Sequence, residues 1–153
     1  MNFTPQQVRQ ILSIPQETLR HWRTTLPPLS GKKGYSPCFS AGDILALRIV
    51  KEIVDKFRIR VQVLVPNSVS LFNTCKGVNW GRTYSQFLVF DPNSSTQIVL
   101  QKADDLKFTP LNSTVMLIPL DYFVEELKSL FAGERNSIQT EMLFPPHVVK
   151  RSA

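Results

Sequence analysis

The segment that follows Ser40 constrains the fold more than any other part of this sequence, because its pattern is that of a long amphipathic helix. Ser40-Ala41-Gly42-Asp43 has the composition of a helix N-cap. Apolar side chains then recur at helical spacing, while the opposite face is charged and includes the i,i+4 pair Glu52 and Lys56. The predicted buried stripe is Ile44, Leu47, Val50, Ile53, Val54 and Phe57. We therefore predict a helix that runs to about Phe57.

Two shorter helices are predicted ahead of this one. Thr4-Pro5-Gln6-Gln7 offers a hydroxyl N-cap, a proline at the first helical position and a glutamine that completes a capping box. The helix that follows should stop at Ser13-Ile14-Pro15, and a second helix should run from Pro15 or Gln16 to about Arg23. The core positions predicted for the two helices are Val8, Ile11, Leu12, Leu19 and Trp22.

A basic turn separates the second helix from the long one. Leu26-Pro27-Pro28-Leu29 ends the second helix, and Ser30–Tyr35 has the glycines and lysines of a tight basic hairpin. After the long helix, the apolar spacing between Val61 and Phe72 predicts one or two short helices, although Pro66 interrupts it.

The character of the sequence changes beyond Gly77. Residues 85–91 and 96–101 are predicted strands joined by a turn at Pro92–Ser95, and Thr114–Ile118 is a predicted buried strand. Asp121 should cap a last helix that ends at Gly133 and packs through Phe123, Val124, Leu127, Leu130 and Phe131. The core positions expected in this half are Phe87, Val89, Ile98, Leu100, Val115, Leu117, Phe123 and Leu127.

These elements predict an α+β protein: a mostly helical winged helix-turn-helix followed by a small α+β module of hairpin, buried strand and helix. We assign residues 1–75 to the first unit, 76–133 to a dimerisation or sensing module, and 134–153 to an irregular tail.

The net charge is unevenly distributed along the chain. Residues 1–66 hold ten Lys and Arg against four Asp and Glu, so this part carries 10 − 4 = +6. The rest of the chain has eight of each, and the whole excess of 18 − 12 = +6 therefore lies in the first part. A localised basic surface attracts phosphates through counterion release, so we expect a polyanion to bind the N-terminal half.

The order of motifs in this half resembles the DNA-binding domain of the MerR (mercury-resistance regulator) family. The resemblance is carried by 8–14, by Glu17-Thr18-Leu19-Arg20-His21-Trp22, by Gly31-Lys32-Lys33-Gly34-Tyr35 and by the segment that starts at Phe39-Ser40. It covers about the first 65 residues and implies a winged helix-turn-helix. The second helix would lie in the major groove of double-stranded DNA and the wing would follow the backbone.

The resemblance also implies which residues contact DNA. Gln16, Glu17 and His21 are expected to reach base edges, because Gln can bind adenine and Glu can accept from cytosine. The residues expected mostly on phosphates are Arg20, Arg23, Lys32, Lys33 and Tyr35, and Thr18 lies on the same helix.

The sequence departs from the family in several respects, and the metal-sensing cysteines of the family are missing, so we do not expect metal-responsive regulation. Pro15 stands where the family has a polar N-cap, Ser36-Pro37-Cys38 replaces a basic run, and the long dimerising coiled-coil helix is missing. We nevertheless expect a homodimeric transcriptional regulator that contacts RNA polymerase. An excisionase-like or architectural DNA-binding factor, or a protein-interaction adaptor, remains the alternative.

Other classes of protein fit the sequence poorly. His21 and His147 lie near no nucleophile motif, and the sequence contains no phosphate-binding glycine loop, so we do not expect an enzyme. Cys38 and Cys75 are far apart and form no metal motif, so we expect reduced thiols and no cofactor or metal. No apolar run reaches the roughly 18 residues of a membrane span, and the N-terminus lacks signal-peptide features. We therefore expect a cytoplasmic, nucleoid-associated protein.

Overall fold

The computed structural model of the protein describes residues 1–82, 86–91, 99–106 and 114–141, and its mixture of helices and small antiparallel sheets makes it an α+β protein. The helices are α1 Pro5–Leu12, α2 Gln16–Thr25, α3 Ala41–Phe57, α4 Val65–Lys76, α5 Ala103–Leu106 and α6 Leu120–Glu141, with 3-10 helices η1 Pro27–Leu29 and η2 Val61–Leu64. The strands are β1 Asn2–Phe3, β2 Phe39–Ser40, β3 Gln86–Phe90, β4 Val99–Lys102 and β5 Met116–Pro119.

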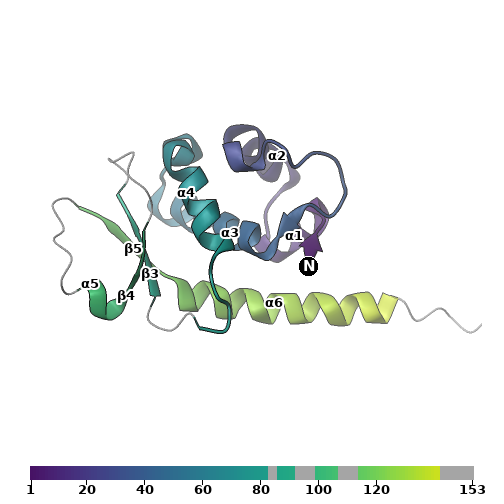
Figure 1. Ribbon diagram of the computed structural model, residues 1–153. Helices are drawn as coiled ribbons and strands as arrows, with labels where there is room; N and C mark the ends of the chain where they lie inside the picture. Colours follow the sequence, from purple (N-terminus) through teal and green to yellow (C-terminus); the bar gives the residue numbers. More distant parts are fainter. Residues whose placement is uncertain (83–85, 92–98, 107–113, 142–153) are drawn as a thin grey trace, which may run out of the picture.

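The long helix α3 lies at the centre of the molecule, as Figure 1 shows. The helices α1 and α2 lie on one side of it, and the sheet of β3, β4 and β5 lies on the other side, beyond α4. The last helix, α6, runs along the base of the molecule from the sheet to beneath the N-terminus. It contacts α1, α3 and β3, so it joins the two ends of the fold.

The N-terminal helices begin and end where local chemistry predicted. The Thr4 hydroxyl accepts a hydrogen bond from the Gln7 amide at 3.2 Å, and the Gln7 side chain accepts from the Thr4 amide at 2.9 Å. Ser13 ends α1 in the left-handed conformation, and the five predicted core positions of α1 and α2 are all buried. The helix α2 extends two residues beyond Arg23, to Thr25.

The predicted cap of the long helix is also present. The Ser40 hydroxyl accepts from the Asp43 amide at 3.2 Å, and the Asp43 carboxylate accepts from the Ser40 amide at 2.8 Å. The buried face is wider than the predicted stripe, because Leu45, Ala46 and Ile49 are fully buried as well. Phe57 was wrongly assigned to this face: it is 55% exposed, since the chain turns away at Arg58 in the left-handed conformation.

The segment 30–36 is not the hairpin that we predicted. It is a compact turn in which the Lys32 amide donates to the Leu29 carbonyl at 3.0 Å, and Gly34 has a φ of 80°. The chain that returns from the turn pairs with β1 instead, through the Cys38 amide and then through the register Phe3↔Phe39. Pro37 has no backbone N–H, which disfavours strand pairing just before this point.

The predicted strands form an antiparallel sheet in the order β4-β3-β5. The pairing of β3 with β4 confirms the hairpin, while its turn at 92–95 and the expected core residue Ile98 lie outside the described residues. The prediction of which face of β3 is buried was wrong. Leu88 and Phe90 are buried, at 0% and 1% exposure, whereas the expected core residues Phe87 and Val89 are only half-buried.

The same error of phase affects the strand predicted to be fully buried. In β5, Ile118 is buried, but Leu117, which pairs with Val89 on the opposite face, is 43% exposed. Leu100 and Val115, also expected in the core, are half-buried. Both faces of this sheet are apolar, so alternation alone could not show which face meets α3 and α4.

The last helix differs from the prediction at both ends. It begins at Leu120, and Asp121 lies in its first turn, where its carboxylate accepts from the Tyr122 amide at 3.0 Å. It continues past Gly133 to Glu141, so residues 134–141 are helical and not part of an irregular tail, while 142–153 lie outside the described residues. Of its predicted packing face, Leu130 is 39% exposed and the others are buried or half-buried.

One hydrophobic core crosses the boundary that we expected at residue 75. Phe131 of α6 stacks on Phe3 at a ring-centroid distance of 4.8 Å and on Trp80 at 5.6 Å. Arg48 of α3 donates two hydrogen bonds to Glu126 of α6, at 2.7 and 3.3 Å. Residues 1–75 and 76–133 therefore share a core.

Candidate nucleic-acid interface

The outer face of α2 carries four exposed polar side chains of the predicted DNA-contacting set. They are Gln16, Glu17, Arg20 and His21, and Thr18 beside them is half-buried. On the opposite face, Leu19 and Trp22 are only 2% and 3% exposed, and they hold the helix against the core. The amphipathic pattern of α2 therefore presents these polar side chains to solvent on a rigid support.

Arg20 is available to bind a ligand. Its only ion pair among the described residues joins it to Glu17 at 3.9 Å, and both side chains are more than three-quarters exposed. Exposed pairs of this kind contribute little and are screened by salt. A phosphate can therefore replace Glu17 as the partner of Arg20 at little cost.

Lys32 does not lie where the resemblance implied. Its side chain is 18% exposed, and its ammonium group lies 2.9 Å from the Asp43 carboxylate. The same ammonium group lies 5.4 Å from the centre of the Phe39 ring and donates a hydrogen bond to the Cys38 carbonyl. These contacts satisfy the ammonium group inside the protein. Lys32 therefore positions the segment 30–36 and is not a phosphate contact in this structure.

The partner of Lys32 is a buried acid that joins three parts of the fold. Asp43 is fully buried, caps α3 through Ser40, and lies 3.4 Å from the ammonium group of Lys76 on α4. Burial by itself raises the pKa of Asp43. Hydrogen bonds from Lys32 and Ser40, together with the charge of Lys32, outweigh burial, so the pKa lies below its ordinary value.

Three other residues predicted to contact DNA lie at or near the turn. Two of them are exposed to solvent, and one is bound to the backbone of the turn. Lys33 is exposed and Tyr35 is 89% exposed. Arg23 is half-buried and donates to the Lys32 carbonyl, which ties α2 to the turn. Lys33 and Tyr35 can therefore extend toward a ligand from a segment whose base is fixed.

A groove runs between α1, α2 and the turn, and it contains an arginine that sequence reasoning missed. The groove has a volume of about 410 Å³, and Arg9, Arg20, Arg23, Gln16 and Tyr35 are among the residues that line it. A second hollow of about 270 Å³ continues past Arg20 and Arg23 to Lys33. The only sequence signal that could have indicated Arg9 is the excess positive charge of the N-terminal half.

Two further cations lie beyond the other side of α2. The Gln62 amide nitrogen on η2 lies 3.5 Å from the His21 ring, and η2 packs against α2. Arg58 and Arg60, which precede η2, are both exposed. Sequence reasoning missed them because they follow the predicted helix and belong to no motif.

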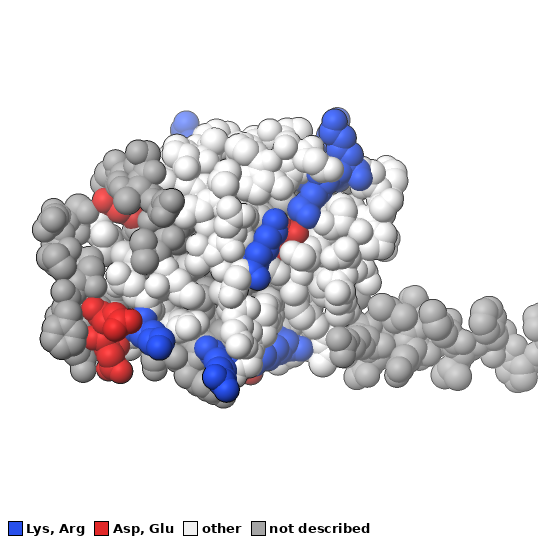
Figure 2. Space-filling model, viewed as in Figure 1, with Lys and Arg blue, Asp and Glu red and all other residues white. Residues whose placement is uncertain are grey.

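Basic and acidic side chains each gather in places on the face shown in Figure 2. In Figure 2, Lys and Arg form a band from the upper right of this face, near the segment after α2, toward its centre. An acidic cluster lies at the lower left of this face, where α5 carries Asp104 and Asp105, and basic side chains lie beside it.

Comparison with family models, curated proteins and solved structures finds no match for this chain. Geometry and charge therefore carry the functional interpretation.

The part of the chain that the structure describes contains no cluster of three or more His, Cys, Asp or Glu side chains suited to a metal ion, and no described helix is long and apolar enough to cross a membrane. Cys38 is half-buried and Cys75 is buried, and both are free thiols. Burial, and next to it the charge of Asp43, raises the pKa of Cys75 far above its ordinary value.

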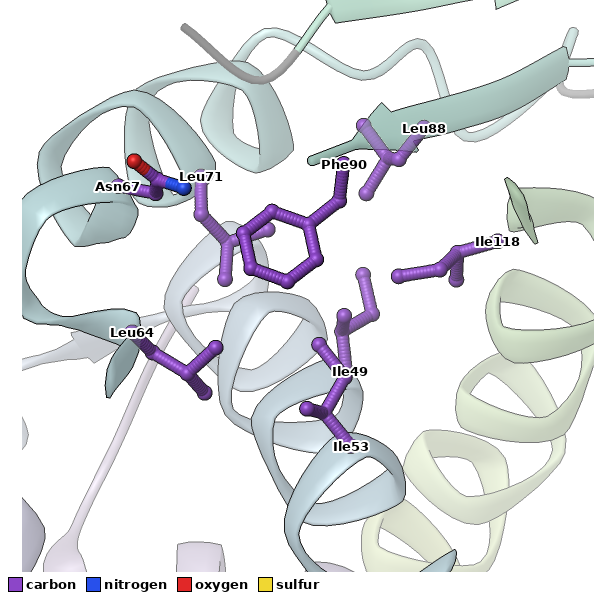
Figure 3. A pocket seen from close by; sticks show the side chains of 8 residues that line it. All are labelled: Ile49, Ile53, Leu64, Asn67, Leu71, Leu88, Phe90 and Ile118. Atoms are coloured by element: carbon purple, nitrogen blue, oxygen red, sulfur yellow. The ribbon is translucent and has the colours of Figure 1, made fainter. Parts of the chain in front are cut away.

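A small apolar cavity lies where α3 and α4 meet the sheet, as Figure 3 shows. Its volume is about 10 Å³, and the Phe90 ring lies against Leu71 across it. Small-molecule sites usually have volumes of roughly 300–1,000 Å³. This cavity is a packing gap in the core and gives no support to the sensing role considered for the second half.

Proposed function

We propose that this protein is a sequence-specific regulator of transcription that binds double-stranded DNA, with α2 in the major groove. The observation that carries the proposal is the exposed polar face of α2 between two sets of cations, held from behind by Leu19 and Trp22. A helix and its side chains fit the major groove, which is about 12 Å wide. Cations on both sides suit the phosphates that border it.

The exposed side chains divide into two roles. Gln16 and Glu17 lie in the first turn of α2 and suit base edges, Gln as a bidentate partner of adenine and Glu as an acceptor from cytosine. Arg20, Lys33 and Tyr35 suit phosphates on one side of α2, and Arg58 and Arg60 suit phosphates on the other.

The test begins with selection of bound sequences from a random duplex library by the whole protein. Affinity for the selected site and for a scrambled duplex is then measured over a salt series. Arg20→Ala should lower affinity for both duplexes and reduce the log–log salt slope by about 0.9. Gln16→Ala should cost about 1–3 kcal/mol on the selected site alone.

Lys102→Ala is the matched control, because Lys102 is exposed on β4, across α3 and α4 from α2. Its affinity should stay within twofold of wild type on the selected site. Failure to enrich any sequence, together with weak binding that ignores Arg20, would contradict the proposal. It would favour an adaptor that binds an acidic protein.

The arrangement of bound sites tests the regulatory part of the proposal. A homodimeric regulator, which would work in the cytoplasm on the nucleoid, should protect an inverted repeat with half-sites about one helical turn apart. Closely spaced direct repeats in a nuclease footprint would favour an architectural factor over a regulator.

A further inference from the structure

The groove between α1 and α2 concentrates positive charge, and the Glu17 carboxylate that lies 3.9 Å from Arg20 is an exposed group outside its lining. Arg9, Arg20 and Arg23 line it, and none of its lining residues is Asp or Glu. Its volume of about 410 Å³ far exceeds the ~30 Å³ that one water molecule takes in the liquid, so a phosphate group and several waters fit. Three guanidinium groups on one concave surface are suited to an oxyanion with several oxygens.

Arg9 is held in this groove with part of its hydrogen-bonding capacity unused. Its Nη1 atom donates to the Gln16 side chain at a long distance of 3.5 Å. Its Nε atom is buried and has no hydrogen-bond partner among the described residues. A buried N–H without an acceptor costs free energy, and a phosphate in the groove would supply that acceptor once the Arg9 side chain turns its Nε–H group toward it.

We propose that this groove is a seat for one phosphate group, with Arg9 as its inner donor and Arg20 and Arg23 at its sides. Both Gln16 and Arg20 line the groove and also lie on the outer face of α2. A duplex bound along α2 therefore brings its backbone to the mouth of the groove. The inference rests on the proposed function for the source of the phosphate, which is the DNA backbone.

The contact between Arg9 and Gln16 couples the phosphate seat to base recognition. In the free protein, the Gln16 side-chain oxygen is the acceptor for Arg9. When a phosphate oxygen replaces the Gln16 oxygen as the acceptor for Arg9, the Gln16 side chain is released. It can then extend to a base edge. Because the contact in the free protein is long and its acceptor is neutral, its exchange for a hydrogen bond to a charged phosphate oxygen is favourable.

The first experiment is a salt series on the selected duplex with Arg9→Gln, and with Lys102→Gln as the matched control on β4. The log–log slope of affinity against salt should fall by about 0.9 for Arg9→Gln and stay at the wild-type value for Lys102→Gln. A double-mutant cycle of Arg9→Gln with Gln16→Ala should be non-additive on the selected site, because the two side chains act on each other.

The second experiment follows the Arg9 Nε–H group directly in the wild-type protein by ¹H–¹⁵N NMR, with its signal assigned by its loss in Arg9→Gln. Addition of duplex should shift this signal, and ethylation of one backbone phosphate should abolish the shift. Titration with inorganic phosphate separates the sources: saturable binding in the absence of any DNA binding would retain the seat and assign it to a free phosphate compound.

The two proposals fail in distinguishable ways. If wild type binds DNA, but Arg9→Gln keeps the wild-type slope and the Nε–H signal does not move, the phosphate seat is wrong and the proposed function stands. If wild type binds neither DNA nor inorganic phosphate, both are wrong. The NMR measurement decides the case even if Arg9→Gln folds poorly, because it uses the wild-type chain.

Discussion

At the scale of single residues, Asp43 connects three parts of the fold. Its carboxylate accepts from Ser40 at the start of α3 and faces Lys32 from the turn and Lys76 from α4. Removing one member of a buried ion pair leaves the other without a partner, which typically costs about 3–5 kcal/mol. The position of the turn beside α2 therefore depends on an acid that lies outside the candidate interface.

The lowered pKa of Asp43 predicts a stability that falls in acid. The folded state favours the charged carboxylate, so its contribution is fully present above the ordinary pKa of 3.8 and is lost as the pH falls through the lower folded value. Urea unfolding from pH 7 down to pH 2 should show this loss, and Asp43→Asn should show less of it. Equal acid dependence in both proteins would contradict the prediction.

Gly42 is required by the packing of α3 on α4. A Cβ atom added there would lie 2.6 Å from the Lys76 Cα atom, which is backbone and cannot move aside cheaply. Gly42→Ala should therefore destabilise the protein by about 1–3 kcal/mol in denaturant unfolding. Gly31→Ala is the control, since nothing lies within 4 Å of its added Cβ atom. A Gly42→Ala protein as stable as wild type would show that α4 can shift.

At the scale of elements, the sequence predicts the ends of α2 well and the end of α6 poorly. The ends of α2 follow from proline and from local apolar spacing, and the structure places them within two residues of the prediction. In α6, Gly133 predicts the end of the helix, yet the helix continues through it to Glu141. A glycine in a helix ends it only when the chain turns there, and no local feature decides that.

The continuity of α6 makes a prediction of its own. Gly133 lies inside the helix, is exposed, and has nothing within 4 Å of an added Cβ atom. Gly133→Ala should therefore stabilise the protein by about 0.5–1 kcal/mol, because alanine is the better helix former. Thermal unfolding followed by circular dichroism measures this, and destabilisation would mean that α6 ends at Gly133.

At the scale of the whole molecule, α3 connects the candidate interface to the sheet and to α6. Its side chains face the N-terminal helices, the apolar gap beside Leu88 and Phe90, and the base helix through Arg48 and Glu126. The support for α2 is therefore built from residues of both halves of the chain.

This shared core predicts that the first half does not fold alone. A chain truncated after Lys76 would expose the side of α3 that β3, β5 and α6 cover, including Ile49 and Ile53. We expect such a fragment to lack a cooperative unfolding transition in calorimetry and to bind DNA far more weakly than the whole chain. A fragment that unfolds cooperatively would contradict this prediction and support a division at residue 75.

The sequence by itself determined the features that depend on neighbouring residues. The caps at Thr4 and Ser40, the buried pair Leu19 and Trp22, and the exposed face of α2 all follow from contacts within four residues. Such contacts are present in the sequence pattern because helix geometry fixes which side chains meet.

Tertiary structure decided the features that depend on residues far apart. Lys32 lies outside the predicted interface because its ammonium group pairs with the buried Asp43, which is eleven residues further along the chain. Arg9 lines the candidate interface because α1 folds against α2. In β3, the side chains that are buried are those on the face that packs toward α3 and α4. A charged or apolar side chain has several local options of similar energy, and only the three-dimensional packing selects among them.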